Sequence, residues 1–361
     1  MQKYRIGTNG LVAFASSFLL LVLIVAAILQ AGCGFAEREV TLQGAGATFP
    51  NPIYQQWFSI YAADHPKVKF DYQAIGSGGG QKQILARTVD FAASDAPLKD
   101  KDLASAPGAI IHIPSVLGAV AITYSFPSLT RDLQLTPETL VNIYLGKIKK
   151  WNDPAIKAVN QSIVLPAAEI SVTHRSDGSG TTFVFTDYLS KVSQEWQRKV
   201  GSSTLVDWPV GVGAKGNEGV AQLATQTVYS IAYVELKYAM DNHLHYVSMM
   251  NAAGCFVKPT LESITAAAGT AQVRDDLRVS ITDAPGKEAY PIASFTYLLA
   301  YQDQTDQTKA RALVDFLWWA THEGQGAARQ MMYAPLPEEI VGKVEGKIRS
   351  ITCQGRPLYE R

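Results

Sequence analysis

Three glycine-rich segments that carry hydroxyl side chains constrain the fold more than any other feature of this chain. They are residues 44–49 (Gly-Ala-Gly-Ala-Thr-Phe), 76–80 (Gly-Ser-Gly-Gly-Gly) and 175–182 (Arg-Ser-Asp-Gly-Ser-Gly-Thr-Thr), here called the first, second and third loops. Each opens a predicted helix. The first turn of a helix has unpaired N–H groups and a partial positive charge, so each loop is a candidate anion site. Together the three loops predict a binding site in which N–H and O–H donors hold a small tetrahedral anion.

Strand and helix patterns alternate between these loops. Proline near a helix start and apolar residues at helical spacing indicate helices, whereas alternation and short apolar runs indicate strands. Strands are expected at 68–74, 90–95, 110–124, 170–174 and 291–301. One helix is expected to begin near residue 51 and another to run from the second loop to residue 89, and further helices are expected over 137–144, 218–226 and 308–323. This order predicts an α/β fold with mostly parallel sheets flanked by helices, and ligands bind such sheets at the carboxyl ends of strands.

Length and charge limit the classes of protein. The chain has 361 residues, of which 47% are apolar and 18% charged, and its formal net charge is zero. This length is enough for two ordinary globular domains. The neutral balance argues against nucleic acid as a partner, because proteins that bind phosphate backbones carry basic surfaces. It does not exclude one small anion.

The N-terminus is typical of an export signal. Lys3 and Arg5 precede an apolar run over residues 11–29, which ends at Gln-Ala-Gly-Cys over 30–33. We expect a signal peptide over 1–32 and a linker over 33–39. The run is also long enough to span a bilayer, so a retained anchor is the alternative.

Cys33 is a candidate for lipidation after cleavage. The small residues before it resemble a bacterial lipobox, although Gln30 stands where an aliphatic residue is usual. If Cys33 is lipidated or removed, Cys255 and Cys353 remain. They are candidates for a disulfide in an oxidising periplasm, and two buried free thiols are the alternative.

The first two loops offer donors that also have ordinary structural explanations. Thr48 can donate its hydroxyl and Phe49 its N–H, but the pair also fits a plain helix cap with a core aromatic residue. Ser77 stands among glycines, which let a backbone approach a ligand closely, although a flexible turn has the same composition.

The third loop is the most specific of the three. Arg175 carries a fixed fork of donors that suits an oxyanion, and Ser179, Gly180 and Thr181 present hydroxyl and N–H groups at a helix start. Asp177 is expected to pair with Arg175 and hold its guanidinium. A surface turn with a salt bridge is the alternative.

Asp95 is the unusual member of the predicted site. A carboxylate beside an anion is repulsive unless a proton lies between them. A partly protonated oxyanion can donate that proton to Asp95, whereas a fully deprotonated one such as sulfate cannot, and an unpaired buried acceptor costs about 1–3 kcal/mol or more. The alternative is a helix cap near Lys99.

Other patterns in the chain indicate little. Residues 211–216 match G-x-G-x-x-G without a clear preceding strand, so we expect no dinucleotide site. His243 and His245 are interpreted as structural, and we expect no metal and no cofactor. The lysines over 147–150 are interpreted as a solvated face.

Several blocks together resemble one known family. They include Gly-Ala-Gly-Ala-Thr-Phe-Pro at 44–50, Ile-Gly-Ser-Gly-Gly-Gly at 75–80, Val-Asp-Phe-Ala-Ala-Ser-Asp-Ala-Pro-Leu at 89–98, Arg-Ser-Asp-Gly-Ser-Gly-Thr at 175–181, and further blocks at 143–148, 151–153, 215–220 and 282–287. In this order they resemble the periplasmic phosphate-binding proteins, PstS, of the phosphate-specific ABC transporter. The family often has serine where Gly78 stands.

The resemblance implies a two-lobed type II periplasmic binding protein that is not an enzyme and closes like a clamshell. Residues 40–115 with 291–361 would form lobe I and 116–290 lobe II, joined by a two-strand hinge near 114–116 and 290–292. Carried over by motif, the residues that contact phosphate are Thr48, Phe49, Ser77, Asp95, Arg175, Ser179, Gly180 and Thr181. Asp177 would orient Arg175.

The resemblance also implies a partner and a location. The chain would be a monomer in the periplasm, free or anchored through a lipidated Cys33, and would deliver phosphate to a membrane permease with a cytoplasmic ATPase. A binder of sulfate or molybdate, a secreted phosphatase-like enzyme, and a surface-anchored sensor or adhesin remain alternatives. The nucleophile–base pair or metal cluster that a phosphatase needs is not visible in the sequence.

Overall fold

A long mixed sheet runs through the part of the chain that the structure describes. The computed structural model describes residues 39–126 and 132–358. The predicted signal peptide over 1–32, the linker up to residue 38 and the lipidation candidate Cys33 lie outside the described residues. All the strands and helices named below belong to one unit, Val40–Arg361.

The strands follow the alternation expected from the sequence. They are β1 (Val40–Gly46), β2 (Val68–Gln73), β3 (Phe91–Ser94), β4 (Ile110–Tyr124), β5 (Gln134–Leu135), β6 (Ser171–Arg175), β7 (Val212–Ala214), β8 (Ser230–Glu235), β9 (His245–Tyr246), β10 (Ser248–Met250), β11 (Phe256–Val257), β12 (Ala293–Tyr301), β13 (Asp303–Gln304), β14 (Thr352–Cys353) and β15 (Arg356–Pro357).

The helices lie between these strands and after them. They are α2 (Asn51–Asp64), α3 (Ser77–Leu85), α4 (Asp100–Ser105), α5 (Pro137–Tyr144), α6 (Pro154–Ala158), α7 (Gly180–Val192), α8 (Gln194–Lys199), α9 (Gly216–Gln226), α10 (Leu236–Asp241), α11 (Leu261–Ala268), α12 (Gln307–Thr321), α13 (Gln325–Gln330) and α14 (Glu338–Arg349). Helix α3 ends before the expected residue 89, because Arg87 adopts a left-handed φ of 54° that a helix cannot continue.

The central sheet is parallel towards both ends and antiparallel in the middle. Its strand order is β2-β1-β3-β12-β4-β8-β6-β7, with β9 also paired to β4. Strand β1 runs parallel to β2 and β3, and β6 runs parallel to β7 and β8. Strands β4 and β12 run antiparallel to their neighbours. The predicted α/β fold is confirmed.

A bulge interrupts the pairing of the two middle strands. Val116 of β4 stands opposite Thr296 of β12 and Pro114 opposite Tyr297, so that Ser115 is an extra residue on β4. The Ser115 hydroxyl donates to the Thr296 carbonyl at 3.2 Å. The first expected crossover, at 114–116, thus lies at this bulge, and the second, at 290–292, directly precedes β12.

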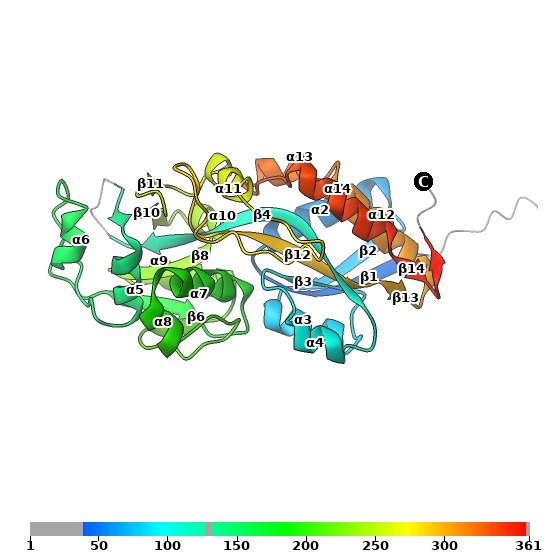
Figure 1. Ribbon diagram of the computed structural model, residues 1–361, viewed down its shortest axis with the longest axis horizontal. Coiled ribbons are helices and arrows are strands. Elements are labelled where there is room, and N and C mark those ends of the chain that lie inside the picture. Colours follow the sequence, from blue (N-terminus) through cyan, green and yellow to red (C-terminus); the bar gives the residue numbers. More distant parts are fainter. Residues whose placement is uncertain (1–38, 127–131, 359–361) are drawn as a thin grey trace, which may run out of the picture. The chain divides into compact units, whose positions relative to one another are not determined.

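Helices cover both faces of the sheet and bury its apolar residues. Helix α3 packs on β1 and β3, α12 on β1, and α9 on β6 and β8; α3 and α12 lie on opposite sides of the sheet (Figure 1). The largest buried side chains include Trp57, Trp151 and Trp196. Every residue of β4 and β12 is buried, as expected of central strands with both faces covered.

The three loops stand where the sequence predicts, each at the start of a helix. Helix α2 begins two residues after the first loop, with Pro52 in its first turn. Helix α3 begins at Ser77, so that Gly76 is its N-cap and the other glycines of the second loop lie at the start of the helix. Helix α7 begins at Gly180, and the Ser179 side chain caps it by accepting from the Thr182 N–H at 3.0 Å.

The candidate disulfide between Cys255 and Cys353 is wrong, because both cysteines are free. Cys255 precedes β11 in a turn held by Asn251, whose side-chain oxygen accepts from the Cys255 N–H at 3.0 Å. Cys353 is buried in β14, which belongs to a different sheet. A disulfide needs two Cα atoms within about 7 Å of each other. The local sequence around two cysteines does not indicate whether they lie that close in the fold.

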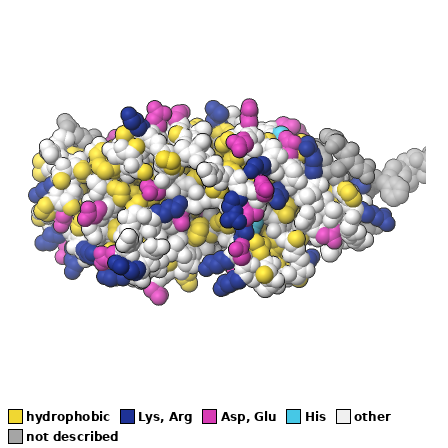
Figure 2. Space-filling model, viewed as in Figure 1, with side chains coloured by type: hydrophobic (Ala, Val, Ile, Leu, Met, Phe, Trp, Pro, Cys, Tyr) yellow, Lys and Arg dark blue, Asp and Glu magenta, His cyan; other side chains and the backbone are white. Residues whose placement is uncertain are grey.

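The described residues include no helix that could span a bilayer, and the face seen in Figure 2 carries charges of both signs. Each helix within residues 39–126 and 132–358 is too short or too polar to cross a bilayer. Lys and Arg side chains are interspersed with Asp and Glu on this face (Figure 2), which agrees with the formal net charge of zero.

Replacing Gly80 by alanine should destabilise the fold by about 1–3 kcal/mol through overpacking. A Cβ at this position would lie 2.5 Å from the Gly46 Cα and 2.6 Å from the Ala45 carbonyl oxygen, and both are backbone atoms that cannot move aside. Urea unfolding of the variant measures the change in the free energy of unfolding.

The matched control is Gly342→Ala within α14, where a Cβ meets no atom within 4 Å. It should stabilise the fold by about 0.5–1 kcal/mol, because alanine loses less backbone entropy than glycine in a helix. Two variants with equal stability would contradict the proposed close packing of α3 on β1.

Candidate functional site

The structure brings the three loops together. The Gly76 N–H of the second loop donates to the Gly46 carbonyl of the first at 2.8 Å. The Gly78 N–H donates to the Gly178 carbonyl of the third loop, also at 2.8 Å. These main-chain contacts, made at glycines, place the starts of α2, α3 and α7 around one small region.

The first loop contributes a buried hydroxyl and a core aromatic ring. Thr48 is buried, and its Oγ1 accepts from the Asn217 side-chain Nδ2 at 2.8 Å and from the Asn217 N–H at 3.3 Å. The Phe49 ring packs on Gly118 of β4, where a Cβ would lie 2.5 Å from it. Only the main chain of Phe49 is therefore left for a role at the site.

The second loop meets both Asp95 and the third loop at Ser77. Ser77 is fully buried, and its Oγ accepts from the Asp95 N–H at 3.2 Å. A Cβ built on Gly180 would lie 2.3 Å from Ser77 Oγ and 2.3 Å from Asp95 Oδ2. A side chain at position 180 would therefore fill this region, which only glycine leaves open.

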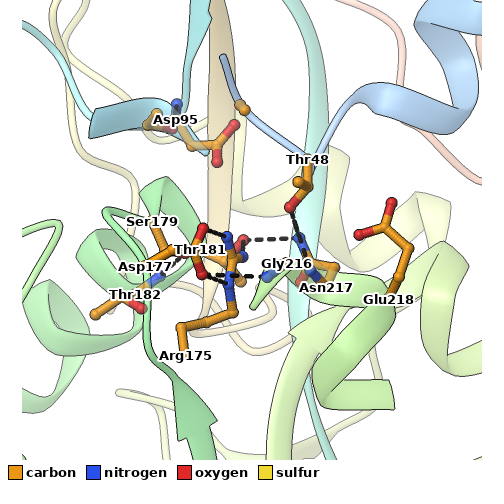
Figure 3. A network of polar contacts seen from close by, with 12 residues as sticks. Thr48, Asp95, Arg175, Asp177, Ser179, Thr181, Thr182, Gly216, Asn217 and Glu218 are labelled. Atoms are coloured by element: carbon orange, nitrogen blue, oxygen red, sulfur yellow. Dashed lines mark hydrogen bonds and ion pairs between the residues drawn. The ribbon is translucent and has the colours of Figure 1, made fainter. Parts of the chain in front are cut away.

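Asp95 is a buried carboxyl with one oxygen free to accept. It follows β3 and is 1% exposed. Its Oδ1 accepts from the Thr296 hydroxyl at 2.7 Å, whereas its Oδ2 has no hydrogen-bond partner among the described residues. Burial raises the pKa of Asp95 to about 7, although the hydrogen bond from Thr296, the charge of Arg175 and the nearby Ser77 hydroxyl lower it. Asp95 faces the other polar groups across a gap (Figure 3).

Arg175 is held at the end of β6 by the ion pair predicted with Asp177. The guanidinium is 1% exposed, and its Nε and Nη2 donate to the two Asp177 oxygens at 2.8 and 2.6 Å. Burial would raise the pKa of Asp177, but hydrogen bonds from Arg175 and the Gly216 N–H hold it below its usual value. The Gly216 N–H donates to Asp177 Oδ1 at 3.1 Å.

The start of α7 supplies the remaining predicted groups. Ser179 and Thr181 are fully buried, and Gly180 is the first helical residue. Thr181 Oγ1 accepts from Arg175 Nη1 at 3.4 Å and from Asn217 Nδ2 at 3.0 Å. The hydroxyl of Thr181 thus links the guanidinium to the start of α9.

All eight predicted contact residues and Asp177 lie around these loops, and four residues that the sequence reasoning missed support them. Asn217 bridges Thr48 and Thr181, and Thr296 holds Asp95. The Tyr238 hydroxyl donates to the Thr48 carbonyl at 2.6 Å. The fourth is Glu235. Of the sequence blocks that resemble the family, only the one at 215–220 contains any of these four residues, and the resemblance gave Asn217 no role.

Glu235 is a second buried carboxyl beside the site. It is fully buried, its Oε2 accepts from the Tyr333 hydroxyl at 3.1 Å, and its Oε1 has no partner among the described residues. Burial raises the pKa of Glu235 to about 8, against hydrogen bonds from Lys237 and Tyr333, and the charge of Asp95 raises it further. Two buried carboxyls near one another make this region costly to ionise.

The arrangement can bind an anion that carries a proton. Hydroxyls, main-chain N–H groups and a guanidinium supply donors, and Asp95 Oδ2 supplies an acceptor. A cleft of about 580 Å³, lined mainly by residues 95–102, by α7 and by residues 274–282, borders Asp95 but none of the other predicted contact residues. Within the described residues, no three His, Cys, Asp or Glu side chains gather as metal ligands would.

The fold and this site define a substrate-binding protein. A model for a PBP superfamily domain matches residues 35–323. The Phosphate-binding protein PstS of Pasteurella multocida is 44% identical over 339 residues, which cover 92% of this chain and 98% of the relative. That of Haemophilus influenzae is 44% identical over 318 residues, which cover 87% and 93%. The chain belongs to the PstS family of phosphate-binding proteins.

A solved structure agrees with the fold. The periplasmic phosphate-binding protein PfluDING, determined with phosphate bound, superposes with a TM-score of 0.71 at 23% identity. The match covers 85% of this chain and 93% of that chain. The predicted type II periplasmic binding protein architecture is confirmed at the level of the fold.

Raising the pH should destabilise the ligand-free protein through Asp95 and Glu235. Folding raises the pKa of Asp95 from its ordinary 3.8 to about 7 and that of Glu235 from 4.5 to about 8. Between these limits the unfolded state binds fewer protons than the folded state, so stability falls as the pH rises. Thermal unfolding from about pH 4 to about pH 8 measures the slope.

Asp95→Asn and Glu235→Gln should each flatten this slope, because the neutral amide does not titrate. Asp64→Asn, at the exposed end of α2, is the charge-matched control and should leave the slope unchanged. Slopes equal to that of the wild type in both buried-site variants would rule out the raised pKa values.

Proposed function

We propose that this chain binds one inorganic phosphate ion between the three loops and delivers it to an ABC permease for import. Its relatives are named phosphate-binding proteins, and the family is one of binding proteins rather than enzymes. The observation that carries the proposal is the pairing of many donors with one unsatisfied buried acceptor, Asp95 Oδ2.

The donors proposed for the ion come from all three loops. Thr48, Phe49 and Ser77 donate from the first and second loops, and Arg175, Ser179, Gly180 and Thr181 donate from the third. The ion enters between helix starts, where N–H groups and the helix dipole favour negative charge. Asp177 accepts from Nε and Nη2 of Arg175, and Thr181 accepts from Nη1. Because each Nη nitrogen carries two hydrogens, the second N–H of Nη1 and of Nη2 is left for the ion.

Asp95 selects phosphate over sulfate in this proposal. Phosphate keeps at least one proton at neutral pH and can donate it to Asp95 Oδ2, whereas sulfate has no proton to give. With sulfate, the buried carboxylate would face an anion oxygen without a hydrogen. An unsatisfied buried acceptor costs about 1–3 kcal/mol, and more when it is charged. For a charged carboxylate we therefore expect a cost above about 1.4 kcal/mol, which is a discrimination of at least about tenfold.

The number of donors is sufficient for tight binding. Hydrogen bonds to charged groups contribute about 1.5–3 kcal/mol each, and a micromolar dissociation constant needs about 8 kcal/mol in total. Several such bonds therefore leave free energy that offsets dehydration of the ion and closure of the protein around it.

The proposed closure joins two lobes, residues 40–115 with 291–361 and residues 116–290. Contacts that would cross between them include the Gly78–Gly178 hydrogen bond and the bond from the Tyr238 hydroxyl to the Thr48 carbonyl. The segments at 114–116 and 290–292 are the proposed hinge. A bulge at Ser115 suits this role, because a bulge bends and twists the strand that carries it.

The proposed location is the periplasm. The N-terminal signal over 1–32 supports export, and Cys33 is proposed as a lipid anchor on the exported chain. The closed monomer would dock on a permease that is driven by a cytoplasmic ATPase. No cofactor takes part in the binding that we propose.

Calorimetry with phosphate and sulfate tests the proposed role of Asp95. The wild type should bind phosphate at micromolar concentration or below and sulfate at least tenfold more weakly, on the order of 1.4 kcal/mol. Asp95→Asn should reduce this ratio to near one, because the amide can donate to either ion.

Asp64→Asn changes the net charge equally at an exposed position and should keep the wild-type ratio. A wild type that ignores phosphate would end the proposal. An Asp95→Asn variant with undiminished selectivity would remove Asp95 as the acceptor of the phosphate proton.

A further inference from the structure

We infer that Asn217 is a positioning residue that turns the hydroxyl protons of Thr48 and Thr181 towards the bound anion. The inference rests on the proposed function, because it concerns the same site. The role of Asn217 is inferred from its hydrogen bonds in the structure, because the resemblance to the family assigned it none.

Asn217 lies where the first and third loops meet. It is the second residue of α9 and is fully buried. Its Nδ2 donates to Thr48 Oγ1 at 2.8 Å and to Thr181 Oγ1 at 3.0 Å, and its main-chain N–H donates to Thr48 Oγ1 at 3.3 Å. Figure 3 shows the side chain between the two threonines.

A third contact fixes which end of the Asn217 amide faces the threonines. Its Oδ1 accepts from the Glu235 main-chain N–H at 3.0 Å. Exchanging the amide oxygen and nitrogen would place two donors against each other at Glu235 and turn both threonine contacts around. The network therefore assigns the NH₂ group to the side of Thr48 and Thr181.

The number of hydrogen bonds then decides what each hydroxyl can do. A hydroxyl has one donor and two acceptor positions. Thr48 Oγ1 accepts from both nitrogens of Asn217, and Thr181 Oγ1 accepts from Asn217 Nδ2 and from Arg175 Nη1. With both acceptor positions filled, each hydroxyl has only its proton left to offer.

This arrangement makes the two threonines obligate donors to a ligand. An anion oxygen can accept both protons, but a ligand hydroxyl or amine that tries to donate to these oxygens finds no lone pair. Asn217 therefore contributes to selectivity without touching the ion. Because one amide serves Thr48 before α2 and Thr181 in α7, the two donors are also coupled to each other.

Substitutions at position 217 test this positioning role by phosphate calorimetry. Asn217→Ala should weaken phosphate binding about tenfold, since the loss of oriented donors is equivalent to about one hydrogen bond to a charged group. Asn217→Asp should weaken it about 100-fold or more, because an ionised carboxylate accepts the threonine protons itself and repels the anion. Gln226→Glu, at the exposed end of α9, adds the same charge and should change the affinity less than about twofold.

A double-mutant cycle separates positioning from a general structural role. In a Thr48→Val background, Asn217→Ala should weaken binding only about threefold, because one of the two hydroxyls it orients is gone. If the losses simply multiply, Asn217 does not act through Thr48 and the inference is wrong. The inference would also be overturned if the wild type binds phosphate and Asn217→Ala binds it with the same affinity. Wild type that does not bind would instead end the proposed function.

Neutron diffraction of the wild-type complex with phosphate gives a test that needs no variant. The deuterons on Thr48 Oγ1 and Thr181 Oγ1 should point to phosphate oxygens, and both Asn217 Nδ2 deuterons should point to the threonines. A threonine deuteron directed at Asn217 would contradict the inference even if the variants failed to fold.

Discussion

The close approach of three glycine loops is the constraint on which the site depends. Gly180 lies so near Ser77 and Asp95 that a single Cβ would fall 2.3 Å from both side chains. The Gly78–Gly178 hydrogen bond joins the second and third loops directly through the main chain. These contacts gather three helix starts, and with them a field that favours an anion, in a region closed to bulkier residues.

Within that region the polar side chains act either as hydrogen-bond donors to the anion, as supports for those donors, or as an acceptor. Asn217 and Arg175 donate to the threonine hydroxyls, so those hydroxyls have protons to give. Asp177 neutralises and orients the guanidinium. Asp95 alone presents an unsatisfied buried acceptor among the proposed contact residues, and burial raises its pKa to about 7. Donors therefore supply affinity, while this one acceptor supplies the distinction between protonated and unprotonated anions.

Sequence patterns predicted the local elements well and the long-range contacts poorly. The helix over 137–144 and the three helix starts follow from proline placement, capping residues and apolar periodicity, which are local signals. Asn217 and Thr48 are 169 residues apart, and no periodicity could pair them. The same limitation explains the wrong disulfide: Cys255 and Cys353 were paired because they were the two cysteines left, whereas in the fold Cys255 lies in the turn before β11 and Cys353 in β14, which belongs to another sheet.

The most direct test is a crystal structure of the chain with phosphate at atomic resolution. We predict one dehydrated ion with ligands from all three loops and a phosphate oxygen about 2.5–2.7 Å from Asp95 Oδ2, the length of a charge-assisted O–H···O bond. An ion bound elsewhere, or one whose nearest oxygen is separated from Asp95 by water, would contradict this mode of binding.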